Sequence, residues 1–168
     1  MPATYDEIMV YAVPSDTGSV TLGSGGQGTI PQTYTDLVVI VTSKDTRAIS
    51  GACDLTVRWN GYTSNYSVAT INGITGSAGN GNSFIPSAHP GANDQHCTSI
   101  WHFSDYRNAN KKKQVTCQIG HIFGSDGGVR IQHCTNTTNN NAITSITFTG
   151  ENGIKAQSVF KMYGILEA

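Results

Sequence analysis

The stretch that decides the fold reads Ile30-Pro31-Gln32-Thr33-Tyr34-Thr35-Asp36-Leu37-Val38-Val39-Ile40-Val41, and in it a polar turn changes abruptly into an unbroken apolar run. Proline fixes φ and has no N–H to donate, and Asp36 and the two threonines can bond to nearby backbone, so the first half favours a turn. The run from Leu37 to Val41 suits a strand that is buried on both faces. We therefore expect the edge of a β-sandwich here, with a second sheet over one face of the strand and a neighbouring subunit over part of the other.

The composition of the whole chain also favours an all-β fold. Of its 168 residues only 12% are charged and 19 are glycine, and long helical stretches of Ala, Glu, Lys and Leu are missing. A chain of this length fits one domain. We expect residues 1–168 to form a single antiparallel β-sandwich, jelly-roll-like, with about 8 to 10 strands.

Apolar alternations recur between turn signals along the chain, at the spacing of a sandwich or barrel. The expected strands are Tyr5–Val13, Ser19–Leu22, Asp36–Thr42, Asp54–Asn60, Asn65–Ile71, Thr98–Ser104, Lys113–Gly120, Gly128–His133, Ala142–Thr149 and Ala156–Leu166.

Glycine and asparagine mark the connections between these strands. Asn60-Gly61 readily takes the positive φ angles of a tight hairpin turn, so Asp54–Asn60 and Asn65–Ile71 are expected to pair antiparallel. The segment Asn72–Asn93 is too polar and too rich in glycine to pack a core, and is predicted to be a loop. Thr135–Asn141 is predicted to be a second polar apex.

The charge and the termini argue against several kinds of partner. A formal net charge of −1 gives no large field with which to capture nucleic acid or an anionic membrane. No window holds the roughly 18 apolar residues of a membrane span, and the N-terminus lacks the pattern of a signal peptide. We therefore expect a chain that is made in the cytoplasm, with its four cysteines as free thiols.

Metal and enzyme signatures are poorly supported. The five histidines and the cysteines lack the paired spacing of a structural zinc site, and adjacent His-Cys residues on a strand point to opposite faces. The chain has no G-x-S-x-G elbow, H-E-x-x-H motif, P-loop or G-x-G-x-x-G after a strand. The expectation is a protein that is not an enzyme and has no metal and no cofactor.

A polar turn followed by three lysines suggests a small contact surface. Lys111-Lys112-Lys113 follows Ser104–Asn110, which is typical of a solvated apex, but tyrosine and arginine often anchor interfaces. The candidate partner-contact residues are Tyr106, Arg107, Asn108, Lys111 and Tyr62. A reader of glycans would use exposed aromatic side chains such as Tyr62, Tyr66 and Tyr106.

Four segments together resemble a β-sandwich module of tailed bacteriophage virions. They are Ile30 to Leu37, Trp59-Asn60-Gly61 with Asn65-Tyr66-Ser67, Asp105-Tyr106-Arg107-Asn108 with a lysine after it, and Tyr163-Gly164-Ile165. The module typically reads as an I-P-x-x-Y-x-D-L strand entry, an N-G turn, a Y-x-N turn with lysine and a terminal Y-G-I strand. The resemblance covers nearly the whole chain.

The resemblance implies a non-enzymatic protein on the exterior of a virion, either head decoration or the knob of a tail fibre, and such modules commonly form trimers. Because Tyr5 already begins the first expected strand, we expect no shaft before the module, which favours a homotrimeric decoration (cement) protein on the major capsid protein or another virion protein. The alternatives are a tail-fibre or baseplate domain that recognises a host surface glycan, and a carbohydrate-binding accessory of an enzyme.

Overall fold

The computed structural model describes residues 5–46, 53–72, 75–81, 87–88, 96–123 and 126–166. These residues form twelve strands and no helix. The strands are β1 (Tyr5–Ala12), β2 (Thr17–Gly23), β3 (Asp36–Ser43), β4 (Cys53–Trp59), β5 (Tyr66–Asn72), β6 (Thr75–Gly81), β7 (Ser87–Ala88), β8 (Cys97–Ser104), β9 (Gln114–Phe123), β10 (Asp126–Asn136), β11 (Ser145–Ile154) and β12 (Val159–Ile165).

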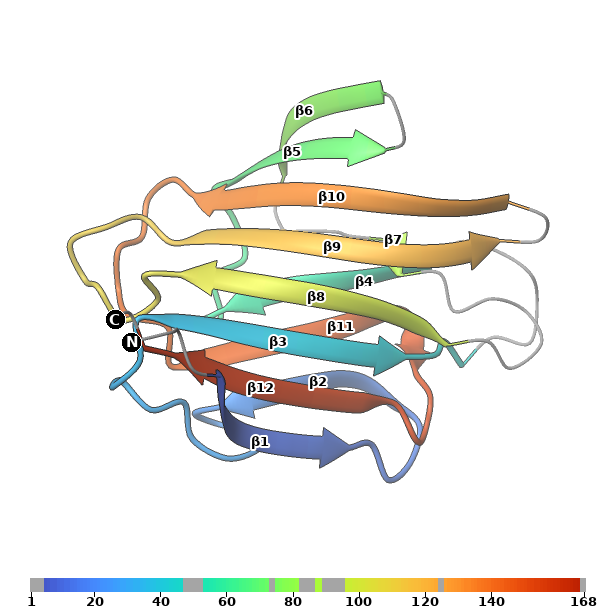
Figure 1. The fold of residues 1–168 in the computed structure, drawn as a ribbon, viewed down its shortest axis with the longest axis horizontal. Coiled ribbons are helices and arrows are strands. Elements are labelled where there is room, and N and C mark those ends of the chain that lie inside the picture. The colour runs from blue at the N-terminus through green and yellow to red at the C-terminus, as the bar shows by residue number, and fades with distance from the viewer. Residues whose placement is uncertain are drawn as a thin grey trace.

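Two antiparallel sheets pack face to face (Figure 1). The larger sheet has the strand order β1-β12-β3-β8-β9-β10-β5-β6, and the smaller has the order β2-β11-β4-β7. If the hairpins β5–β6 and β9–β10 are set aside and the other eight strands are counted from one to eight along the chain, the larger sheet has the order 1-8-3-6 and the smaller sheet has the order 2-7-4-5. This is the order of a jelly roll, and the expected all-β sandwich is confirmed.

The two additional hairpins extend the larger sheet. β9 pairs with β8, β10 pairs with β9, and β5 pairs with β10, so the insertions lie side by side although 41 residues separate the end of β5 from the start of β9 by number. The smaller sheet packs against the rest of the larger sheet (Figure 1). Because the two hairpins lengthen the larger sheet, its outer face is long.

Large aromatic side chains from both sheets meet in the core. Trp101 of β8 contacts Phe148 of β11 edge to face, with ring centroids 5.5 Å apart, and Trp59 of β4 contacts Phe103 of β8 at 6.3 Å. Both tryptophans are fully buried. Such edge-to-face pairs stabilise the contact by about 0.5–1.5 kcal/mol beyond the burial of their area.

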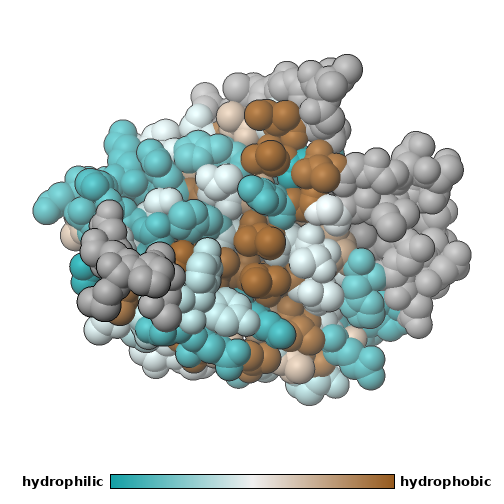
Figure 2. Space-filling view, in the orientation of Figure 1, coloured by the Kyte–Doolittle hydropathy of each residue, from teal (hydrophilic) through white to brown (hydrophobic). Residues whose placement is uncertain are grey.

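The deciding stretch forms a turn and then β3, as predicted, but β3 is not at an edge. It lies third in the larger sheet, between β12 and β8. Leu37, Val39 and Val41 are fully buried against the smaller sheet, which confirms the covered inner face. On the outer face Val38 is buried and Ile40 is half-buried, and Figure 2 shows apolar side chains crossing the face of the molecule that it displays. Coverage of this face by a neighbouring subunit stays a prediction.

The expected pairing of Asp54–Asn60 with Asn65–Ile71 is wrong, although the turn between them has the expected geometry. Asn60 and Gly61 have φ of 51° and 70°, and the N–H of Tyr62 donates to the Trp59 carbonyl at 3.1 Å. However, β4 pairs with β11 and β7, whereas β5 pairs with β10 and β6. The turn therefore sends the chain from the smaller sheet to the larger one.

The predicted loop Asn72–Asn93 is wrong where the structure describes it. β6 pairs with β5 along its whole length and β7 pairs with the start of β4, while residues 73–74, 82–86 and 89–93 lie outside the described part of the chain. The second predicted apex begins inside β10. Beyond it the Asn136 carboxamide oxygen accepts bonds from the N–H groups of Thr138 and Asn139 at 3.1 and 3.0 Å, which closes the turn.

Cys117 and Cys134 are buried free thiols, as expected, Cys97 is also buried, and the side chain of Cys53 lies outside the described residues. Across the described ranges, no helix has the length and apolar character needed to cross a membrane.

Candidate functional site

Two of the distant motifs meet at Tyr34 and Gly164. A Cβ built on Gly164 of β12 would lie 2.3 Å from two ring carbons of Tyr34, so the aromatic ring occupies the space of the missing side chain. The Thr35 N–H donates to the Ile165 carbonyl at 2.8 Å beside this contact. The glycine of the Y-G-I strand is therefore explained by the tyrosine of the strand entry.

Asp36 joins the strand entry to the turn after β8. One carboxylate oxygen accepts a 2.8 Å bond from the Asp105 N–H, and the other lies 2.7 Å from Nε2 of His102. Asp105 has a positive φ of 52°, which its bonded N–H helps to hold. The Asp105 carboxylate in turn pairs with the Lys111 ammonium, and this hydrogen bond lowers the pKa of Asp105 below its usual value.

Tyr106 is fully buried, which corrects its assignment as a partner contact. Its hydroxyl donates to the Pro31 carbonyl, and its own carbonyl accepts from the Ile143 N–H at 2.8 Å. Burial raises the pKa of Tyr106. This side chain fastens the strand entry to the turn after β8 and cannot touch a partner.

The other candidate contact residues keep exposed surface. Arg107 is exposed and donates to the Thr33 carbonyl at 3.4 Å, and Lys111 is exposed beside its partner Asp105. Asn108 accepts from the Asn110 N–H at 2.9 Å within the same turn. Contact of these residues with a partner stays a prediction.

Tyr62 lies apart from this turn along the chain, after β4. It is half-buried against the core, and its hydroxyl accepts a 3.0 Å bond from the Asn141 carboxamide. It therefore fastens one loop to another, and its role as a contact also stays a prediction.

Lys113 was missed by the sequence reasoning, which counted it in a solvated basic run. Its side chain is buried, and its ammonium donates to the carbonyls of Asp105, Asn108 and Lys111. Burial lowers the pKa of Lys113. The signal was present in the sequence, because Lys113 is in phase with the buried alternation of Val115, Cys117 and Ile119.

We call this set of contacts the loop junction; its residues are Pro31, Tyr34, Asp36, Asp105, Tyr106, Lys113 and Gly164. It joins the strand entry, the turn after β8 and the last strand. Its bonds are directed inward and serve to fix the fold.

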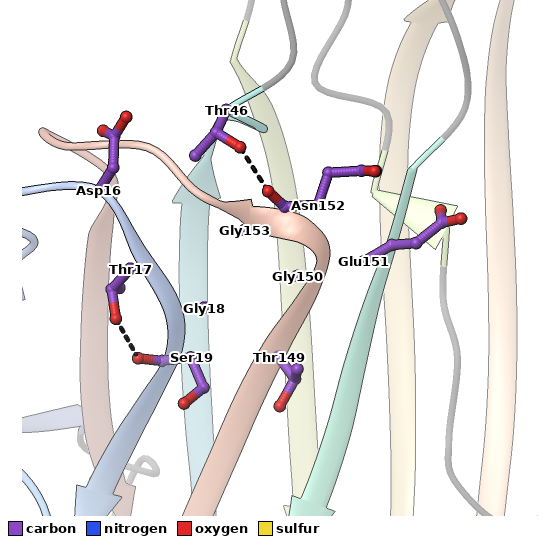
Figure 3. Close-up of a pocket in the computed structure, with 10 residues that line it drawn as sticks. All are labelled: Asp16, Thr17, Gly18, Ser19, Thr46, Thr149, Gly150, Glu151, Asn152 and Gly153. Atoms are coloured by element: carbon purple, nitrogen blue, oxygen red, sulfur yellow. Dashed lines mark hydrogen bonds between the residues drawn. The ribbon is translucent and has the colours of Figure 1, made fainter.

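A polar pocket of about 760 Å³ opens at one end of the smaller sheet, between β2 and β11 (Figure 3). β11 bulges there, since its pairing with β2 shifts between Thr149 and Ile154. Gly153 has a φ of 106°, and a Cβ on Gly150 would lie 2.5 Å from the Gly153 carbonyl oxygen. The bulge therefore depends on glycine at both positions.

The pocket is lined by hydroxyl, carboxylate and amide groups. Figure 3 shows the carboxylates of Asp16 and Glu151 on opposite sides of it, with the Thr46 hydroxyl bonded to the Asn152 carbonyl between them. Asp16 accepts from the Ala156 N–H at 2.8 Å, and Glu151 accepts from the Asp54 N–H at 3.3 Å. Carboxylates held in this way have lone pairs left for the hydroxyl groups of a ligand.

Within the described ranges, no group of three or more His, Cys, Asp and Glu side chains is arranged to hold a metal ion. His102 pairs with Asp36, and His133 lies 3.3 Å from the Thr116 hydroxyl and 3.4 Å from that of Thr135.

The described strands define a jelly-roll β-sandwich whose larger sheet is extended by two hairpins. A scan against protein-family models and a search of curated proteins found no match to the chain.

Proposed function

We propose that this protein is a non-enzymatic structural component of a bacteriophage virion. It acts as a capsid decoration (cement) protein that binds the exterior of the head as a homotrimer and stabilises the shell. Its partner is the major capsid protein or another protein of the virion surface.

The observation that carries this proposal is the loop junction. Three of the four segments that resemble the virion module are far apart in the sequence, yet Tyr34 meets Gly164, Asp36 bonds to Asp105, and Tyr106 bonds to Pro31. These contacts accompany the pairing of β3 with β12 and with β8, so the three segments belong to one packed unit. Motifs that interlock in this way support a shared structural module.

The physical demands of decoration agree with this proposal. A capsid presents the same local surface many times, so a symmetric oligomer gains avidity from several modest contacts. A jelly roll with aromatic core contacts between its two sheets provides a rigid block for such contacts.

The test mixes the purified protein with empty heads of the phage that carries this sequence. We expect co-sedimentation of the protein with the heads and a rise in their melting temperature. Arg107→Ala removes an exposed cation of the predicted contact surface and should weaken binding. Lys112→Ala removes an exposed lysine from the same turn, outside the predicted set, and should bind as the wild type does. Heads that neither bind the protein nor gain stability would contradict the decoration function.

The polar pocket favours a second candidate, a tail-fibre or baseplate domain that recognises a host glycan. Sugar hydroxyls could bond to Glu151 and Asn152 beside the bulge of β11. If a glycan array gave binding that Glu151→Gln and Asn152→Ala removed, while Asn110→Ala outside the pocket kept it, this candidate would replace decoration.

A further inference from the structure

A single row of side chains crosses the outer face of the larger sheet. Val10 of β1 is in register with Lys161 of β12, Lys161 with Ile40 of β3, and Ile40 with Ile100 of β8. Ile100 is then in register with Gln118 of β9, Gln118 with Ile131 of β10, and Ile131 with Ile71 of β5. We call this line of residues the apolar row; Figure 2 shows brown, apolar side chains crossing this face, with teal polar side chains between some of them.

Four of the five apolar members of the row are exposed to solvent, and Ile40 is half-buried. The exposed fractions are 49% for Val10, 42% for Ile100, 37% for Ile131 and 55% for Ile71. Single exposed apolar residues are normal on a protein surface, but a contiguous patch marks an interaction site. Alignment across seven strands is therefore the informative feature.

The row is long and narrow. Six strand spacings of about 4.8 Å give it a length of about 29 Å. On β8 it is flanked along the strand by His102 and Thr98, and on β9 by Thr116 and Gly120, which are polar or small. The apolar surface is thus about one residue wide on β8 and β9, and it is wider on β10, where Val129 lies beside Ile131 on the same face.

We propose that three copies of this chain meet along the apolar row, around a threefold axis parallel to it. This inference extends the proposed function and takes the number of copies from it. A flat dimer would bury the whole outer face of about 34 by 23 Å, or about 800 Å² on each copy, together with its polar flanks. In a trimer the outer faces of the three copies would meet at about 60°, and only the line of residues nearest the axis would be fully buried. A narrow row requires burial of that line alone.

The two polar members of the row are compatible with this seam. Residues at one level of a threefold seam meet their own copies, so three Gln118 carboxamides would come together, and each can both donate and accept a hydrogen bond. A polar level of this kind fixes register and the number of copies in coiled coils. Lys161 can lay its aliphatic stem in the seam and extend its ammonium to water.

The test compares two glutamines of β9. Gln118 and Gln114 are both exposed and lie on the same face of the same strand, but only Gln118 belongs to the row. Light scattering after size exclusion should give the wild type three times the 17.8 kDa of one chain. Gln118→Glu places three carboxylates at one level, so it should be monomeric at pH 7 and regain the trimer below the usual carboxyl pKa of about 4.3. Gln114→Glu should stay trimeric at both pH values.

Ile100→Glu is the second variant and should be monomeric at pH 7, with circular dichroism confirming that each variant is folded. A wild type that is a monomer or a dimer would overturn the inference, and so would a trimer that survives both Gln118→Glu and Ile100→Glu. The head-binding assay separates this result from the proposed function. A trimer that ignores heads contradicts decoration alone, and a monomer that binds them contradicts the seam alone.

Discussion

The ring of Tyr34 lies where a side chain at position 164 would be, and this contact explains two residues at once. Gly164 lies within β12, one residue before its end, and glycine in a strand costs about 0.5–1 kcal/mol relative to alanine when there is room for a methyl group. Here there is no room, because a Cβ would lie 2.3 Å from the ring. Glycine at this position is therefore a requirement of packing.

Gly164→Ala should lower the free energy of unfolding by about 1–3 kcal/mol, the usual cost of overpacking. The measurement is urea unfolding followed by circular dichroism. The cost should be smaller in a Tyr34→Ala background, because residues in contact are energetically coupled. Gly120→Ala is the matched control: Gly120 is also in a strand, its added Cβ would meet nothing within 4 Å, and its stability should be unchanged or slightly increased.

The buried thiols give a second prediction at this scale. Burial raises the pKa of the Cys117 thiol well above its usual range and that of Cys134 to about 12. Alkylation needs the thiolate, and an unfolded cysteine has a pKa of about 8.5. Iodoacetamide at pH 7 and pH 9 should therefore leave both cysteines unmodified in the folded protein. In denaturant both should react, faster at pH 9, as peptide mass spectrometry would show. Rapid labelling of the native protein would contradict their burial.

Among the elements, the turn at Asn60-Gly61 shows why a correct local prediction led to a wrong pairing. Positive φ angles at both residues make the turn reverse the chain, whichever sheet receives the next strand. The Asn60 carboxamide helps to determine the path of the chain after the turn, because it bonds to residues that are distant in sequence. Its oxygen accepts from the Thr144 and Ser145 N–H groups at 2.9 and 3.3 Å, and its nitrogen donates to the Ala142 carbonyl at 2.8 Å.

Asn60→Ala should lower the free energy of unfolding by about 1–3 kcal/mol, because three backbone groups, two of them half-buried, lose their acceptor or donor. Asn65→Ala is the matched control. Asn65 also has a positive φ, of 67°, but within the described part of the chain its carboxamide bonds only to the neighbouring Ser64 hydroxyl at 3.1 Å. Thermal unfolding of the two variants should differ by the energy of the Asn60 bonds. Equal melting temperatures would mean that backbone strain alone explains the turn.

Lys113 tests the loop junction in the same way. Lys113→Met keeps the buried stem but removes the donor for three carbonyls, so stability should fall by about 1–3 kcal/mol. Lys112→Met, at the exposed neighbouring position, should change stability little. Chemical denaturation of both variants measures the difference, and an equal effect would contradict a structural role for the Lys113 ammonium.

The sequence predicted strands well where side chains alternate and poorly where the backbone alone makes the sheet. Asp36–Ser43 was recognisable because its apolar run needs burial. β6 reads Thr-Gly-Ser-Ala-Gly-Asn-Gly, has no apolar alternation, and forms by pairing with β5. Tyr106 was placed on the surface because its neighbours are polar, yet its hydroxyl finds an acceptor in Pro31, 75 residues away. No local pattern contains such a partner.

At the scale of the whole molecule, the jelly roll makes the order of folding depend on distant segments. β12, the last strand, lies between β1 and β3, and β11 lies between β2 and β4. Neither sheet can be completed before the end of the chain arrives. Topologies dominated by such non-local pairs fold slowly, in milliseconds to seconds.

One consequence is that both sheets should unfold together. Trp59 lies in the smaller sheet and Trp101 in the larger, and both are fully buried in the shared core. Trp59→Phe leaves Trp101 as the fluorescent reporter, and Trp101→Phe leaves Trp59. Within each variant, the fluorescence and circular dichroism transitions in urea should coincide, as in a two-state domain. Trp59→Phe should be the milder change, since its indole N–H is buried with no partner among the described residues, whereas that of Trp101 donates to the Ser99 hydroxyl at 2.8 Å. In one variant the fluorescence transition could precede the circular dichroism transition, while in the other it coincided with that transition or followed it. In that case the two sheets would be separate folding units, and residues 1–168 would not be a single domain.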